Sequence, residues 1–175
     1  MRVALLPLGE LPQGALAPLA ARLGGLGIAC VTRAAAELPP EAYVPDRGRW
    51  DADRILEELP PSVGETLVAV TGEDLFAGGL KFVFGLADAE RRVALVSVAR
   101  LRSRSPAATG ARLVKEVVHE LGHTLGMAHC PDPTCVMHFS NSLADTDGKG
   151  STLCESCEAR VPEEARKAFA GPRRG

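Results

Sequence analysis

The sequence is poor in aromatic residues and has no excess of positive charge. Only 4% of its 175 residues are aromatic, so we expect no stacking platform for single-stranded nucleic acid. Its 20 basic residues are outnumbered by 22 acidic ones, whereas a duplex-binding protein needs a dominant basic surface. Nucleic acid is therefore not an expected partner.

Long apolar runs are missing as well. No run approaches the roughly 18 residues that a membrane-spanning helix needs, so we expect no membrane partner. The N-terminal apolar run is broken by Pro7, Gly9 and Glu10, whereas a signal peptide needs a longer run and a cleavage site of small residues. We therefore expect a cytoplasmic protein.

The remaining composition is that of one globular domain. Hydrophobic residues make up 46% of the chain and charged residues 24%, which excludes a disordered chain. The length corresponds to about one domain of ordinary size. We expect this single domain to be a monomer.

Strand-like and helix-like segments alternate, which predicts an α/β (α+β) fold with parallel strand pairing. We expect strands over residues 2–8, 28–32, 66–71, 81–86 and 92–101. We expect helices over residues 13–24, 51–59, 110–125 and 162–170. Residues 34–48 are expected to form a connecting loop. The short polar gap at 87–91 favours an antiparallel hairpin, so the sheet should be mixed, with about five strands and one antiparallel strand.

The helix over 110–125 has the clearest pattern. At 100° per residue its apolar side chains fall on one arc, and His119 and His123 project about half a turn away from the centre of that arc. Gly126 is expected to end the helix in a left-handed conformation. The apolar arc consists of Val114, Val117, Val118, Leu121 and Leu125.

A metal-binding motif, HELGHTLGMAH, covers residues 119–129. His119 and His123 are four residues apart, so both imidazoles can reach one zinc ion at about 2.0–2.1 Å. The turn at Gly126 lets His129 supply a third ligand. Three nitrogen ligands leave zinc an open position for water, and Glu120 can act as general base on that water. Three of the chain's four histidines fall in this motif, which disfavours the interpretation as ordinary surface residues.

The five cysteines are unevenly placed, with Cys30 alone in an apolar stretch and most simply buried. The other four crowd into the last third of the chain, where a structural zinc site is the favoured interpretation. Disulfides and free thiols remain as alternatives. The clustered residues are Cys130, Cys135, Cys154 and Cys157.

The pattern HExxHxxGxxH, followed by Met137 and these cysteines, resembles the archaemetzincins, a branch of the metzincin zinc metallopeptidases. The resemblance implies a metzincin-like fold with an upper subdomain over residues 1–126 and a zinc-stabilised lower subdomain over 127–175. It implies two zinc ions per chain, one catalytic and one structural. Met137 would form a floor under the histidines.

Some metzincins place a tyrosine after this methionine, but the chain's single Tyr is Tyr43, far upstream. His138 or Asn141 are the candidates to stabilise the oxyanion instead. The resemblance also implies that the antiparallel strand, expected at Phe82–Leu86, lies at the edge of the sheet and aligns an extended peptide substrate with the metal.

The sequence therefore predicts a zinc metallopeptidase that acts on peptides or proteins, with Glu120 as general base. One alternative is a catalytically silent zinc and peptide-binding protein, which the presence of Glu120 disfavours. The other is a regulatory module built on the four-cysteine site. The acidic residues around that site disfavour nucleic-acid contact.

Overall fold

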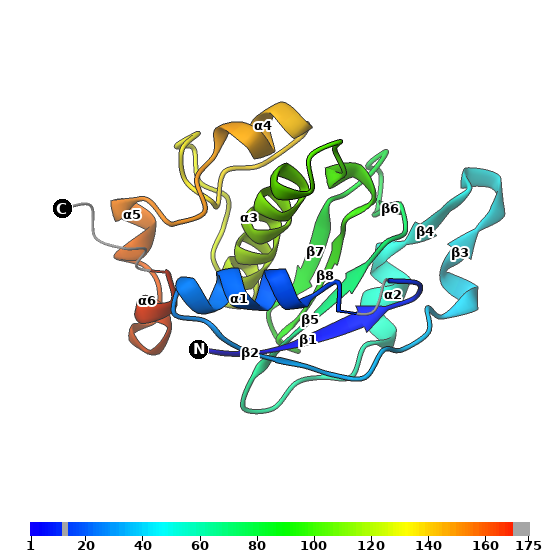
Figure 1. Cartoon of the computed structure of the whole chain (residues 1–175), viewed down its shortest axis with the longest axis horizontal. Helices are drawn as coiled ribbons and strands as arrows, with labels where there is room; N and C mark the ends of the chain where they lie inside the picture. Colours follow the sequence, from blue (N-terminus) through cyan, green and yellow to red (C-terminus); the bar gives the residue numbers. More distant parts are fainter. Residues whose placement is uncertain (12–13, 170–175) are drawn as a thin grey trace.

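The computed structural model describes residues 1–11 and 14–169. Its main sheet has five strands in the order β2-β1-β5-β8-β7, as Figure 1 shows. The first four strands run parallel, and β7 pairs antiparallel with β8, which confirms the predicted mixed sheet and its hairpin. The strands are β1 (Arg2–Leu8), β2 (Ala29–Thr32), β5 (Thr66–Thr71), β7 (Gly85–Asp88) and β8 (Val93–Ser97).

Helices cover both faces of this sheet. Successive residues of a strand point to opposite faces, so Val68 of β5 packs with α1 (Ala17–Gly25) and α3 (Pro106–Thr124), while Ala69 packs with α2 (Ala52–Glu58). The side chain of Asp51 accepts the backbone N–H groups of Asp53 and Arg54 and so caps α2. Each helix lies close to its predicted range. The predicted helix ends at Gln13 and Ala170 lie outside the described residues.

Residues 34–48 are more structured than predicted. They contain two single-turn helices, η1 (Pro40–Ala42) and η2 (Pro45–Arg47), and strand β3 (Tyr43–Val44). Strand β3 belongs to a small second sheet in the order β3-β4-β6, with β4 (Arg49–Asp51) and β6 (Leu75–Phe76). Strands of two or three residues are too short to show an alternating pattern, which is why the sequence predicted a loop.

The predicted edge strand at Phe82–Leu86 is wrong in position, because the strand begins at Gly85. The preceding residues pair with the small sheet, since the N–H of Val83 donates to the carbonyl of Leu75 at 3.1 Å. Phe82 and Phe84 pack edge to face, with ring centroids 5.2 Å apart. Residues 82–84 therefore do not pair with β8, and the edge strand covers only Gly85–Asp88.

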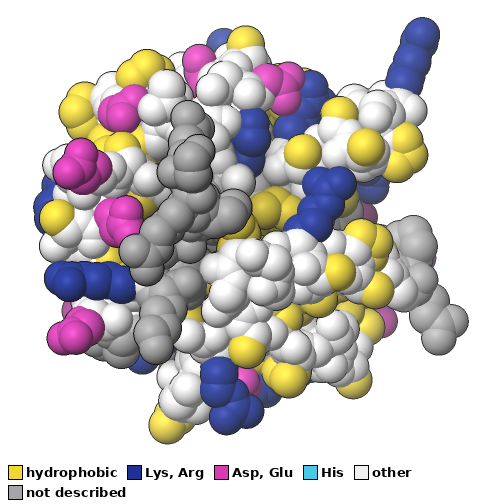
Figure 2. Space-filling model, turned by 60° about the vertical axis from the view of Figure 1, so that its left-hand side comes forward, with side chains coloured by type: hydrophobic (Ala, Val, Ile, Leu, Met, Phe, Trp, Pro, Cys, Tyr) yellow, Lys and Arg dark blue, Asp and Glu magenta, His cyan; other side chains and the backbone are white. Residues whose placement is uncertain are grey.

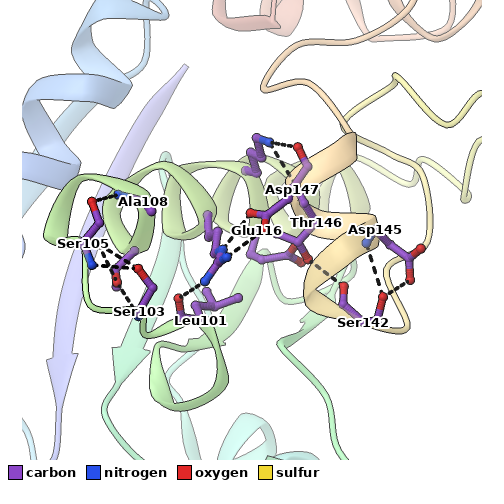
Figure 3. Close-up of polar contacts among 12 residues, drawn as sticks. Leu101, Ser103, Ser105, Ala108, Glu116, Ser142, Asp145, Thr146 and Asp147 are labelled. Atoms are coloured by element: carbon purple, nitrogen blue, oxygen red, sulfur yellow. Dashed lines mark hydrogen bonds and ion pairs between the residues drawn. The ribbon is translucent and has the colours of Figure 1, made fainter.

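Helix α3 is the longest helix in the described part of the chain. It begins four residues before its predicted start, where Ser105 accepts the N–H of Ala108 at 3.3 Å and caps the first turn (Figure 3). It ends at Thr124, and Gly126 follows with φ +78°, which confirms the predicted left-handed turn. Of the predicted apolar arc, only Leu125 is not fully buried.

The chain after Gly126 consists of loops and three short helices, α4 (Leu143–Gly148), α5 (Glu155–Glu158) and α6 (Glu163–Phe169). A third single-turn helix, η3 (Ala99–Leu101), precedes α3. The core beneath α3 continues into this part through buried residues such as Met137 and Val161. Within residues 1–11 and 14–169, no helix combines the length and apolar character needed to cross a membrane.

Candidate metal sites and cleft

Helix α3 and the turn after it bring the three predicted histidines together. The Nε2 atom of His123 lies 3.1 Å from that of His119 and 3.2 Å from that of His129. Nitrogen atoms that each bind one zinc ion at 2.0–2.1 Å in a tetrahedron are about 3.3 Å apart. The spacing of the three side chains therefore fits a single zinc ion.

Hydrogen bonds fix the tautomers of two of these imidazoles. Nδ1 of His119 donates to the carbonyl of Val136 at 2.8 Å, and Nδ1 of His123 donates to the carbonyl of Met127 at 2.7 Å. Because a carbonyl only accepts, the Nδ1 atoms carry the protons and the Nε2 lone pairs face one another. Converging lone pairs repel unless a cation lies between them, so the donor set itself indicates a metal site.

The surroundings of the histidines keep them neutral. Burial lowers the pKa of His119 to about 2, and burial also lowers the pKa of His123 and His129. Neutral imidazole is the form that binds a metal. His129 is exposed, so the third nitrogen lies at the mouth of the site where solvent enters.

The carboxylate of Glu120 lies beside the histidines, against the edge strand. Glu120 is 95% buried and lines the same cavity as His119 and His123. Burial raises the pKa of Glu120 well above its ordinary value, and the neighbouring carboxylate of Glu116 raises it further. A carboxylate whose pKa is raised is a stronger base than an exposed one.

A cavity of about 550 Å³ joins these groups to the edge strand. Residues of strand β7, of α3 and of the segment from Phe139 to Asn141 line this cavity. The outer edge of β7 has no partner strand in either described sheet. The edge of β7 is therefore open to pairing with an extended peptide.

Sulfur atoms form a second cluster, separate from the three histidines. The four predicted cysteines offer Sγ atoms that all lie within 4.8 Å of one another. The Sγ atoms of Cys130 and Cys154 are 3.7 Å apart, which is far longer than a disulfide bond of about 2.05 Å. Four sulfurs that each bind zinc at 2.3 Å are about 3.8 Å apart.

The chemistry of these thiols also fits a metal. Burial raises the pKa of Cys135 and raises that of Cys157 to about 12, because a buried thiolate lacks the solvation that water provides. A cation at the centre of the cluster would reverse this preference and hold the thiolates. Cys30 lies outside the cluster, where its thiol donates to the carbonyl of Ile28.

The two clusters share one loop. The N–H of Cys130 donates to the carbonyl of Met137 at 2.9 Å, and Nδ1 of His138 donates to the carbonyl of Cys130 at 3.0 Å. His138 thus holds the loop and does not line the cavity, whereas Asn141 does line it. Of the two candidates for an oxyanion partner, only Asn141 is placed at the cleft.

Sequence reasoning missed a buried ion pair at the cavity. The Nζ atom of Lys149 lies 3.0 Å from Oε1 of Glu116, and both side chains are nearly inaccessible. Glu116 could have been noticed, because it lies four residues before Glu120 on the same helix face. Lys149 follows α4 in an irregular segment, where the sequence carries no signal of burial.

Comparisons with known proteins agree with this geometry. The sequence model of peptidase family M54 matches residues 25–163. An archaemetzincin of Methanopyrus kandleri is 46% identical over 134 residues, which cover 75% of this chain and 77% of the relative.

Two solved structures share the fold. The archaemetzincin of Archaeoglobus fulgidus matches with a TM-score of 0.85 and 34% identity, covering 92% of this chain and all of that one. A chain of Methanocorpusculum labreanum, described as a zinc-dependent peptidase, matches with a TM-score of 0.82 and 27% identity, covering 91% of this chain and all of that one. The chain belongs to the archaemetzincins, peptidase family M54.

Proposed function

We propose that this zinc-dependent peptidase binds its catalytic ion through His119, His123 and His129 and uses Glu120 as general base. The proposal rests mainly on the positions of three Nε2 atoms beside a buried carboxylate. That of His123 lies 3.1 Å from His119 and 3.2 Å from His129, and all three lie within 4.8 Å of one another. Zinc bound there supplies Lewis acidity, which polarises a peptide carbonyl and makes water more acidic.

The protein's own groups perform the remaining steps. The unpaired edge of β7 holds the substrate extended, with its scissile carbonyl facing the histidines. Glu120 accepts a proton from the water that attacks the carbonyl carbon. It then delivers that proton to the departing amine nitrogen as the C–N bond breaks. Asn141 lines the cleft with a side-chain amide that can donate to the oxyanion.

We further propose a second, structural zinc ion held by the four clustered cysteines. Support comes from the sulfur spacing and from the loop that joins the two clusters through Cys130 and His129. A closed site of four thiolates leaves no position for water, so this ion would stabilise the fold and not react. The lower part of the chain has short helices, and a metal cross-link would reinforce the core that it shares with the upper part.

We also propose one domain with two subdomains, residues 1–126 and residues 127–175. One cluster of buried residues includes members from both parts, from Val3 to Phe169. Met137 of this cluster packs against Gly122 of α3, the helix that bears His119 and His123. This packing supports the proposed role of Met137 as a floor for the site. A cytoplasmic location and a monomeric state stay predictions.

A regulatory module that binds nucleic acid is not favoured. On the face drawn in Figure 2, Lys and Arg side chains are scattered among acidic and uncharged ones and form no broad basic surface. This agrees with the net charge of −2.

Incubation of the zinc-loaded protein with a diverse peptide library, read by mass spectrometry, tests the proposal. We expect chelator-sensitive cleavage by the wild type. The Glu120→Gln variant should keep its fold and its zinc but lose turnover. Undiminished cleavage by Glu120→Gln would show that another group is the base, and a wild type that cleaves no peptide would refute the proposed function.

A further inference from the structure

The cavity extends beyond the proposed catalytic groups to a second buried carboxylate. Glu116 lines it one helical turn before Glu120, on the same face of α3. Its Oε1 atom lies 3.0 Å from Nζ of Lys149 and accepts the hydroxyl of Thr146 at 3.1 Å, a contact drawn in Figure 3. Its Oε2 atom takes part in none of the side-chain hydrogen bonds among the described residues, whereas Oε1 takes part in one. One acceptor oxygen of Glu116 is therefore available to a ligand.

A hydrogen-bond donor lines the same cavity. The hydroxyl oxygen of Ser140 is buried and has no hydrogen-bond partner. No other buried side-chain nitrogen or oxygen of the described residues lacks one. Buried hydroxyls that lack a partner are rare in folded proteins and need an explanation. A ligand that accepts a hydrogen bond from Ser140 provides one.

The charge of the cavity narrows the chemistry of this ligand. Lys149 neutralises the charge of Glu116, so a cationic ligand would gain little electrostatic attraction there. Such a ligand would also be repelled by the ammonium group of Lys149. A ligand carboxylate meets Oε2 of Glu116 and is repelled. A carboxamide matches both groups, because its NH₂ donates to Glu116 while its carbonyl oxygen accepts from Ser140.

The position of Glu116 narrows the length of the ligand. Glu116 lies four positions before Glu120 in α3, so the two residues are about 6 Å apart along the helix axis. The three-carbon reach of a glutamine side chain spans this distance better than the two-carbon reach of asparagine. The walls that such a stem would pass include the apolar side chains of Phe84 and Phe139.

We propose that this part of the cavity binds the side chain of a glutamine residue next to the scissile bond. The proposal rests on the proposed function, because it takes the histidine site as the point of cleavage. It makes Glu116 and Ser140 specificity-determining residues for a peptide substrate.

Peptide binding to the zinc-loaded Glu120→Gln variant tests this without relying on turnover. The probes are blocked alanine heptapeptides with one central guest residue, either Gln, its isostere Glu, Asn or Met, and the measurement is calorimetric Kd. We expect the Gln peptide to bind at least tenfold more tightly than each of the others. Equal affinities, or no measurable binding of the Gln peptide, would overturn the proposal.

Substitution of the donor provides a second test. Adding Ser140→Ala to the Glu120→Gln variant should reduce the preference for Gln over Met to less than threefold. A matched control, Ser156→Ala, removes an exposed hydroxyl of α5 and should leave the preference unchanged. A preference that survives Ser140→Ala would contradict the assignment.

The two proposals fail separately. Cleavage of the peptides by the wild type without any Gln preference, in binding or in kcat/KM, overturns the specificity assignment alone. A retained Gln preference in binding, together with a wild type that cleaves no peptide, overturns the proposed function and supports the binding site.

Discussion

Gly85 and Glu120 lie so close together that a side chain on the glycine would displace the carboxylate. A β-carbon built on Gly85 would come within 2.6 Å of Oε1 and 2.7 Å of Cγ of Glu120. The first residue of the edge strand thus determines where the proposed general base lies.

The Gly85→Ala variant should lower kcat/KM by about 100-fold, because a shift of about 1 Å in a catalytic group has an effect of this size. Zinc content and the melting temperature should change little. Gly79→Ala is the matched control, since a β-carbon there meets no atom within 4 Å. Wild-type kinetics in Gly85→Ala would show that the carboxylate need not lie against the strand.

Gly122 has an equivalent relationship with Met137 beneath the histidines. A β-carbon on Gly122 would overlap Sδ of Met137 and come within 2.9 Å of its Cε, and Met137 is fully buried with little space to move. Gly122→Ala should therefore lower the free energy of unfolding by about 1–3 kcal/mol.

The control for this variant is Gly24→Ala in α1, where the position is exposed and no neighbour lies within 4 Å. It should raise the free energy of unfolding by up to about 1 kcal/mol, as alanine favours a helix over glycine. Urea denaturation measures both. If both variants raised the free energy of unfolding, the close packing of Met137 against α3 would not matter to stability.

The sequence predicted the strands of the main sheet, the helices α1, α2, α3 and α6, and the residues of the two clusters, because their signals are local. The β-branched residues of Thr66–Thr71 predict a strand. The spacing of His119 and His123 on one helix predicts that their side chains lie together. The position of the edge strand could not be predicted, because Val83 pairs with Leu75 of a small sheet that leaves no periodic pattern. Lys149 could not be predicted either, since its burial depends on Glu116, which lies 33 residues earlier in the chain.

The Lys149–Glu116 pair leads to a prediction about stability. Lys149→Met leaves the carboxylate of Glu116 buried without its cation, which should lower the free energy of unfolding by about 3–5 kcal/mol. The double variant Glu116→Gln/Lys149→Met should recover most of this loss, because neither buried charge remains. Denaturant titration of the two variants and the wild type measures the difference. A double variant as unstable as Lys149→Met would indicate that the lost packing of the lysine stem, and not the unpaired charge, is responsible.

The four-cysteine site leads to a prediction about metal content. We expect two zinc ions per chain by elemental analysis, one readily removed by a chelator and one resistant. Cys154→Ser should lose the resistant ion and melt at a clearly lower temperature, because the lower part of the chain depends on it. Cys30→Ser is the control, since Cys30 lies outside the cluster and should leave both ions in place. One ion or fewer in the wild type would refute the structural site.

The most direct measurement is a crystal structure of the protein grown in excess Zn²⁺, with diffraction data collected on both sides of the zinc absorption edge. We predict an anomalous peak about 2.0–2.1 Å from Nε2 of His119, His123 and His129, with the Glu120 carboxylate facing the position that remains open. Imidazole rings turned away from one another, or no peak between them at saturating zinc, would contradict it.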